Sequence, residues 1–247
     1  MPVSLHDTAI LIPVREIDEA FYKLVDEVRQ VVPTWMVCVV VDGSEARMDG
    51  SRMGTPSIVI ELEQNEGKGY ALQTGYKRLY EAGYEAVITL DADGQHPPAL
   101  IPEFLEAALE TNADLVIGNR LGKLSGMPLD RRFSNITSSY LLSLICGKRL
   151  ADAQCGYRWM RLSRWWEIQA DCYRFDFEPQ LLLQAVWLKW RLAFIPIPVL
   201  YLHSGSSVRR VPDTLRFVRM VGKEILRKLS GKYRAGFLED AGSSAAR

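Results

Sequence analysis

The sequence predicts an α/β fold whose central sheet is mostly parallel. Short apolar runs rich in β-branched residues alternate along the chain with segments whose apolar residues recur at helical spacing. The connections between them are short, and polar or glycine-containing breaks follow the apolar runs. Strands and helices that alternate in this way favour a parallel sheet with right-handed crossovers. With 247 residues and 48% hydrophobic composition, the chain can bury a sizeable core.

The first half of the chain shows this alternation most regularly. The run 8–14 predicts a buried strand, and the periodic segment 17–32 predicts the helix that follows it. The run 35–41 predicts a second strand ending at Asp42-Gly43-Ser44, and 57–62 predicts a third, followed by a helix over 67–79. The run 86–90 predicts a fourth strand and 114–118 a fifth, with a helix over 99–110 that has Pro98 near its first turn.

The second half is less regular. A loop punctuated by Gly and Pro over 121–130 precedes an amphipathic helix over 133–145. A polar connection over 152–158 leads to a short strand and to a helix around Trp165, and a further apolar helix ends near Trp190. The prolines in the strand predicted over 192–200 place it at a sheet edge. We expect a catalytic domain over 1–212, a basic amphipathic helix over 213–234 and a disordered tail over 235–247.

Composition excludes several classes of protein. The N-terminus lacks the basic and apolar regions of a signal peptide, and no apolar stretch reaches the roughly 20 residues of a spanning helix. The four cysteines have no C-x-x-C spacing and there are three histidines, so we expect neither a zinc site nor a disulfide framework. We therefore expect a cytoplasmic protein. The net charge is zero, but 209–234 holds nine basic residues against two acidic ones, which makes one end cationic. No nucleic-acid partner is expected, and the oligomeric state is not predicted.

A pair of carboxylates follows the fourth predicted strand. Asp91 and Asp93 stand one residue apart where the apolar run 86–90 ends, before Gly94 and two prolines turn the chain. Alternate residues of a strand face the same side, so both carboxylates can point to the mouth of the sheet. Carboxylate oxygens are the ligands that Mg²⁺ or Mn²⁺ prefers, whereas the alternative is a solvated turn.

A second loop at the same sheet edge is suited to phosphate. Lys68 stands between Gly67 and Gly69 where a helix is predicted to begin. The glycines permit close approach of the backbone, and both the helix N-terminus and the lysine supply positive charge. The loop is not a Walker A motif, and no G-x-G-x-x-G follows the first strand, which disfavours P-loop enzymes and dinucleotide-binding dehydrogenases.

Taken together, these strings resemble the family 2 glycosyltransferases, and among them the dolichyl- or polyprenyl-phosphate sugar synthases. The resemblance runs from about residue 8 to 212 and rests on six strings in order: Ile-Pro, Asp-Gly-Ser, Asn-Glu-Gly-Lys-Gly, Asp-Ala-Asp-Gly-Gln-His-Pro-Pro, Gly-Asn-Arg and Asp-Ala-Gln-Cys-Gly-Tyr-Arg. It implies the three-layer α/β/α nucleotide-diphospho-sugar transferase fold of the GT-A type. It also implies a nucleotide-sugar donor and a metal cofactor, Mg²⁺ or Mn²⁺.

The resemblance further implies a role for each matching residue. Pro13 and Glu16 would line the nucleotide pocket, Asp42 would lie near the base or ribose, and Lys68 would approach the diphosphate. Asp91 and Asp93 would hold the metal with support from Gln95. The candidates for binding a donor or acceptor phosphate are Arg120, Arg131 and Arg158.

Charge indicates the mechanism. A cation and basic side chains stabilise the nucleoside diphosphate that leaves, and direct displacement inverts the anomeric centre. A polyprenyl phosphate acceptor is largely dianionic at neutral pH and needs no general base. If the acceptor is a hydroxyl, Asp152 or Glu178 would be the base, although Asp152 is equally explained as a turn cap.

The acceptor and the membrane leave alternatives open. The segments 131–146 and 213–230 are candidates for peripheral membrane contact at the cytoplasmic face, whereas the second could instead pack its apolar side on the domain and leave its basic face solvated. The rivals to a lipid-phosphate acceptor are a soluble or glycan acceptor and a non-catalytic nucleotide-sugar-binding protein. A sugar-phosphate nucleotidyltransferase is disfavoured because no glycine-rich, arginine-containing loop follows the first strand.

Overall fold

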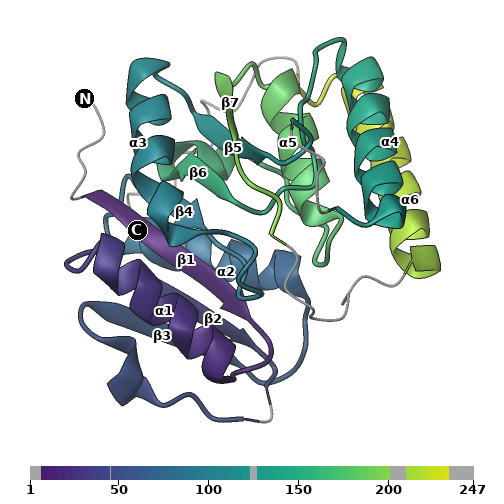
Figure 1. The fold of residues 1–247 in the computed structure, drawn as a ribbon. Helices are drawn as coiled ribbons and strands as arrows, with labels where there is room; N and C mark the ends of the chain where they lie inside the picture. The colour runs from purple at the N-terminus through teal and green to yellow at the C-terminus, as the bar shows by residue number, and fades with distance from the viewer. Residues whose placement is uncertain (1–6, 45, 123–126, 201–209, 234–247) are drawn as a thin grey trace, which may run out of the picture.

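A computed structural model describes residues 7–44, 46–122, 127–200 and 210–233, and it shows a seven-stranded sheet covered by helices (Figure 1). The strand order is β3-β2-β1-β4-β6-β5-β7. The strands are β1 (Thr8–Val14), β2 (Val37–Asp42), β3 (Ser57–Leu62), β4 (Ala86–Thr89), β5 (Leu115–Asn119), β6 (Arg158–Arg161) and β7 (Leu192–Pro196).

The strands run in one direction except β6, which confirms the mostly parallel sheet. Strand β6 lies between β4 and β5 and pairs antiparallel with both, through Ile88↔Trp159 and Val116↔Trp159. β1 and β2 are buried along their whole length, as their unbroken apolar sequences require of strands covered on both faces. β7 is an edge strand, as its prolines predict.

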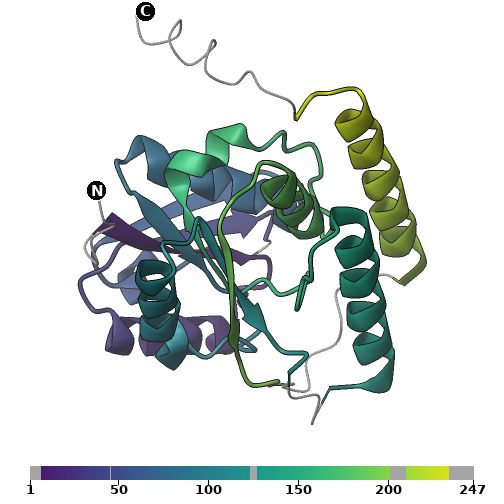
Figure 2. The ribbon, with the colours of Figure 1, turned by 90° about the horizontal axis from the view of Figure 1, so that it is seen from above.

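Helices cover both faces of the sheet (Figures 1 and 2). One face carries α1 and α3, and the other carries α2 and α5. Helices α4 and α6 lie at the end of the molecule beyond α5, where both views show them close together. The helices are α1 (Glu19–Val31), α2 (Lys68–Glu81), α3 (Ile101–Glu110), α4 (Leu129–Cys146), α5 (Phe177–Trp187) and α6 (Arg210–Leu229), with short 3-10 helices at Gly50–Met53, Pro98–Leu100 and Leu162–Glu167.

Several elements differ from the sequence-based bounds, and β7 ends at Pro196 instead of reaching residue 200. Helix α4 begins at Leu129, because Pro128 has extended backbone angles and precedes its first turn. The segment around Trp165 forms a 3-10 helix rather than an α-helix, and its indole packs on Tyr76 with ring centroids 5.2 Å apart. Helix α6 spans Arg210–Leu229 instead of 213–234, and the expected tail over 235–247 lies outside the described residues.

Helix α6 docks on α5 through a buried polar network. Glu224 of α6 is fully buried and accepts hydrogen bonds from Gln180 (2.8 Å) and Gln184 (3.2 Å) of α5 and from Arg227 (2.6 Å). Met220 and Val221 are buried on the same side of the helix. Apolar residues on the other side stay exposed, so α6 both packs on the domain and presents an apolar stripe, which consists of Leu215, Val218, Leu226 and Leu229. No helix within the described ranges is long and apolar enough to span a bilayer.

Candidate active site

Asp42 fixes the loop that leads into α2. Its carboxylate, 5% exposed at the end of β2, accepts hydrogen bonds from the backbone N–H groups of Glu66 (2.8 Å) and Gly67 (3.0 Å). Gly67 has φ +106°, and a Cβ there would lie 2.5 Å from the carbonyl oxygen of Tyr173. Gly67 therefore packs closely against the 173–174 segment, and Asp42 holds the backbone before the start of α2 in place.

Lys68 joins two carboxylates from distant parts of the chain. Its ammonium nitrogen lies 2.6 Å from Asp91 Oδ1 and 3.0 Å from Glu178 Oε1. Burial acts to lower the pKa of Lys68, but the charges of both carboxylates raise it above its ordinary value. Burial acts to raise the pKa of Asp91, but the charge and hydrogen bond of Lys68 together with other nearby charges outweigh it and lower that pKa to about 2. At neutral pH Lys68 is therefore positive and Asp91 negative, and the two form a charged pair.

His96 positions Asp91, a role that the sequence did not reveal. Its ring is 2% exposed, and its Nδ1 accepts a hydrogen bond from the backbone N–H of Asp91 at 2.9 Å. Burial lowers the pKa of His96 to about 4, so the ring is neutral at physiological pH. The ring stacks on Tyr157, with centroids 5.1 Å apart, and the Tyr157 hydroxyl donates to the carbonyl of Pro97 at 3.0 Å. The Gln-His-Pro-Pro and Cys-Gly-Tyr-Arg strings thus form one packed unit.

Gly156 lies directly against the charged pair. A Cβ on Gly156 would stand 2.7 Å from Asp91 Oδ2 and 2.8 Å from Lys68 Nζ, distances that require something to move. The hydroxyl of Thr89 donates to the Gly156 carbonyl at 2.7 Å and holds this backbone in place. The connection over 152–158 therefore forms a wall of the site.

We expect Gly156→Ala to displace Asp91 and Lys68 and to cost about 1–3 kcal/mol of folding free energy, the usual range for overpacking. Urea unfolding of the purified variant measures this cost. Gly222→Ala is the matched control, because nothing lies within 4 Å of the Cβ position in α6 and alanine favours helix. A Gly156→Ala variant as stable as the control would contradict the close contact.

Asp91, Asp93 and Gln95 are the residues of this group that could hold a divalent cation. The exposed Asp93 accepts a hydrogen bond from the backbone N–H of Gln95 at 3.0 Å, which holds its carboxylate on the turn. Partial desolvation by the surrounding turn and the negative charge of Asp91 raise the pKa of Asp93, and a bound cation would offset the repulsion between the two carboxylates. Among the described residues no three His, Cys, Asp or Glu side chains form a cage. Mg²⁺ is commonly bound by one or two carboxylates, and its remaining coordination positions are left to substrate phosphates.

Arg120 and Asp152 form a buried ion pair beside this group. The guanidinium of Arg120 bonds both oxygens of Asp152, with Nε at 2.8 Å from Oδ2, and the carboxylate is fully buried. Asp152 also accepts from the backbone N–H of Gln154 at 3.1 Å. It is therefore both an ion-pair partner and a turn cap.

Arg158 lies beneath the site. It is 3% exposed and donates to the backbone carbonyls of Cys155 (2.7 Å), Glu178 (2.9 Å) and Ala153 (3.0 Å). These contacts join the 152–158 connection to the start of α5, so the structure gives Arg158 a positioning role.

The remaining predicted residues are more dispersed. Pro13 is buried within β1 opposite Val40, and Glu16 is exposed just beyond the same strand. Arg131 lies half-buried in the first turn of α4. The contacts described above thus join the ends of β2, β4 and β5 with the starts of α2 and α5.

Solved structures of glycosyltransferases share this fold. Glucosyl-3-phosphoglycerate synthase from Mycobacterium tuberculosis, in complex with Mn²⁺, UDP and glucosyl-3-phosphoglycerate, superposes with a TM-score of 0.62 over 87% of this chain and 78% of its own, at 14% identity. Mannosyl-3-phosphoglycerate synthase from Rubrobacter xylanophilus superposes with a TM-score of 0.65 over 95% of this chain and 77% of its own, at 17% identity. The fold is that of the GT-A glycosyltransferases.

The family follows from the sequence match. A family model for glycosyl transferase family 2 matches residues 9–168, and the chain belongs to this family of glycosyltransferases. The match ends just after β6 and its 3-10 helix, so it contains the whole group around Asp91 except Glu178.

Two curated relatives have names that specify lipid-phosphate acceptors. Undecaprenyl-phosphate mannosyltransferase of Micrococcus luteus is 29% identical over 208 residues, which cover 80% of this chain and 85% of the relative. UDP-N-acetylglucosamine–dolichyl-phosphate N-acetylglucosaminyltransferase of Methanococcus voltae is 31% identical over 149 residues, 58% of this chain. That match spans 59% of the Methanococcus protein.

Proposed function

We propose that this protein transfers a sugar from a nucleoside-diphosphate sugar to a polyprenyl phosphate, with inversion at the anomeric carbon and with a divalent cation at Asp91 and Asp93. The observation that carries the proposal is that both carboxylates named in the sequence analysis as candidate general bases are buried in ion pairs. Asp152 is fully buried in its pair with Arg120, and Glu178 is 8% exposed in its pair with Lys68. An acceptor that brings its own negative charge, such as a phosphate dianion, needs neither of them.

Each residue of the site has a separate role in the proposed transfer. Asp91 and Asp93 hold the cation, which when bound supplies positive charge to the leaving diphosphate. Lys68 orients Asp91 through its 2.6 Å ion pair and adds a fixed positive charge to the site. His96, neutral and buried, keeps the Asp91 backbone in place. The Arg120–Asp152 pair fixes the 152–158 wall next to the reacting groups.

Two exposed apolar stripes support peripheral membrane contact at the cytoplasmic face. The stripe of α4 recurs at i, i+4 and i+7 spacing and faces solvent; it consists of Leu129, Phe133, Ile136, Tyr140 and Leu144. The second is the stripe of α6, on a helix that also carries the exposed Arg216 and Arg219. Apolar stripes beside cations are typical of helices that lie on anionic bilayers.

We expect Phe133→Ser and Leu226→Ser to weaken binding to vesicles of anionic phospholipid, because the two side chains are 75% and 68% exposed and would enter the interface. Flotation of the protein with vesicles measures the effect. Leu109→Ser on α3 is the control, since Leu109 is 49% exposed on a helix outside both stripes. Equal flotation of all variants would show that the stripes do not meet the bilayer.

The transfer itself is tested with purified protein, detergent-dispersed polyprenyl phosphate and a panel of radiolabelled nucleotide sugars. A labelled lipid that extracts into organic solvent is the expected product. The second candidate is transfer to a soluble phosphorylated acceptor, which is favoured by the phosphoglycerate-directed names of the structural neighbours. Product from phosphoglycerate and none from the lipid would replace the first function by the second, and nucleotide binding without any turnover would contradict both.

A further inference from the structure

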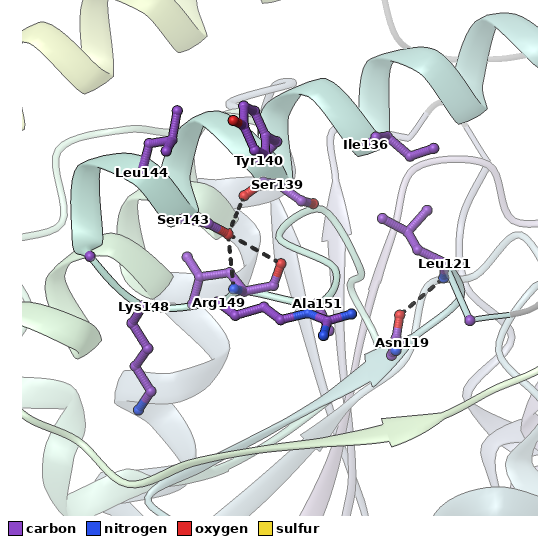
Figure 3. A pocket seen from close by; sticks show the side chains of 13 residues that line it. Asn119, Leu121, Ile136, Ser139, Tyr140, Ser143, Leu144, Lys148, Arg149 and Ala151 are labelled. Carbon is purple, nitrogen blue, oxygen red and sulfur yellow. Dashed lines mark hydrogen bonds between the residues drawn. The ribbon is translucent and has the colours of Figure 1, made fainter.

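A cavity beside α4 lies outside the carboxylate group. It has a volume of about 680 Å³ and opens between the end of β5, α4 and the loop over 147–151 (Figure 3). Its size is within the range of about 300–1,000 Å³ that is usual for ligand pockets. None of the metal or diphosphate residues lines it, so the donor does not account for it.

The cavity combines an apolar rim with two exposed cations, Lys148 and Arg149. Leu121, Ile136, Tyr140 and Leu144 form the apolar part of the lining. Arg149 extends beneath α4 toward Asn119 (Figure 3). Within the part of the chain that the structure describes, its guanidinium has no hydrogen-bond or ion-pair partner. A guanidinium aimed into a pocket without a carboxylate in its lining is suited to bind a phosphate, because its donors can bond two phosphate oxygens at once.

The loop that carries Arg149 is held at fixed points. The hydroxyl of Ser143 on α4 accepts a hydrogen bond from the backbone N–H of Leu150 at 2.9 Å and donates to the carbonyl of Ser139 at 2.6 Å (Figure 3). The hydroxyl of Ser139 accepts from the N–H of Ala153 at 2.9 Å. These bonds fix the backbone on the C-terminal side of Arg149.

The same stretch of chain connects the cavity to the charged group. Three residues after Arg149 comes Asp152, which is paired with Arg120, and four residues further Gly156 touches Asp91 and Lys68. Asn119, at the end of β5, lines the cavity, and the next residue is Arg120. The chain therefore passes directly from the cavity to the edge of the sheet where the donor's diphosphate is expected.

We propose that this cavity binds the acceptor as a phosphomonoester with an apolar tail, with Arg149 bonding the phosphate and the tail leaving across Leu121 and Ile136 toward the stripe of α4. The proposal rests on the function proposed above and adds the acceptor's subsite. The exposed stripe shares Ile136, Tyr140 and Leu144 with the cavity lining, so an isoprenoid chain can pass from the pocket onto an apolar surface.

The test is calorimetric titration with farnesyl phosphate, a short polyprenyl phosphate, in wild-type protein and in Arg149→Gln and Lys148→Gln. We expect Arg149→Gln to weaken binding about tenfold or more, as losing a charge-assisted hydrogen bond does. The Lys148→Gln substitution removes a charge from the neighbouring position, which also lines the cavity, but the Lys148 side chain points away from Asn119 in Figure 3, so we expect its loss to weaken binding less than about threefold. Nucleoside diphosphate binding with Mn²⁺ should be equal in all three proteins, which verifies the fold.

Two further ligands separate the parts of the proposal. Farnesol lacks the phosphate and glycerol 3-phosphate lacks the tail, and both should bind more weakly than farnesyl phosphate. Glycerol 3-phosphate binding equally well would overturn the apolar subsite, and equal binding of farnesyl phosphate to wild-type and Arg149→Gln would overturn the role of Arg149. Sugar transfer with a normal acceptor KM in Arg149→Gln would also reject the subsite and leave the proposed function intact. Farnesyl phosphate binding that depends on Arg149, without transfer from any nucleotide sugar, would retain the subsite and reject the function.

Discussion

Asp93→Asn is expected to lose manganese-dependent binding of nucleoside diphosphate and to lower transfer by about 10²- to 10³-fold, the effect of removing one group that stabilises developing charge. Asp93 suits this test because its carboxylate is exposed and its hydrogen bond comes from the backbone N–H of Gln95, which an amide oxygen also accepts. The substitution therefore removes a charge and leaves the turn in place. Binding of Mn²⁺, followed by its electron paramagnetic resonance signal, measures the effect without reference to activity.

The control for this experiment is Asp26→Asn on α1, which removes the same charge from an exposed position on a helix far from the carboxylate edge in the sequence. It should bind Mn²⁺ and nucleotide as the wild-type protein does. If Asp93→Asn retained the manganese dependence of nucleotide binding, the metal site at Asp91 and Asp93 would have to be abandoned.

Lys68→Met is expected to be the most destabilising single substitution at the site. It leaves Asp91 and Glu178 facing one another without a cation, and their side chains are only 25% and 8% exposed. Removing one partner of a buried ion pair costs about 3–5 kcal/mol, because the remaining charge stays desolvated. Urea unfolding at neutral pH measures the loss.

The matched control is Lys77→Met on the same helix. That lysine is 63% exposed and lies 3.9 Å from Glu81, so its loss should cost less than about 0.5 kcal/mol. The double variant Lys68→Met with Glu178→Gln should recover part of the stability, since it removes one of the two unpaired charges. If Lys68→Met were no less stable than Lys77→Met, the ion triad would not be formed in solution.

The positions at which the strands end were predictable because each is marked by a short, local sequence signal. Each apolar run is too short for a helix and stops at a turn residue, so Asp42 and Asp91 were expected where strands end. Parallel strands with short connections then bring these ends to one edge. The hydrogen bonds of Asp42 to the start of α2, and the ion pair of Lys68 with Asp91, confirm that convergence.

The partners of these residues were not predictable, because they depend on contacts between distant segments. Glu178 is 110 residues from Lys68, and no local pattern joins them. His96 resembled an ordinary turn residue until its burial against Tyr157 was known. Arg158 resembled a phosphate ligand by its charge, whereas three carbonyl groups take its donors. Arg149 carries no motif at all, and its cavity exists only where α4 packs over the loop.

The antiparallel strand β6 affects how the sheet forms during synthesis. β4 and β5 do not pair with each other, since β6 lies between them and bonds both. During synthesis β5 therefore cannot join β4 through β6 until residue 161 has emerged. An N-terminal fragment that stops before β6 would expose the edge of β4. The segments before and after β6 thus build one sheet together, and we expect neither to fold as an independent unit.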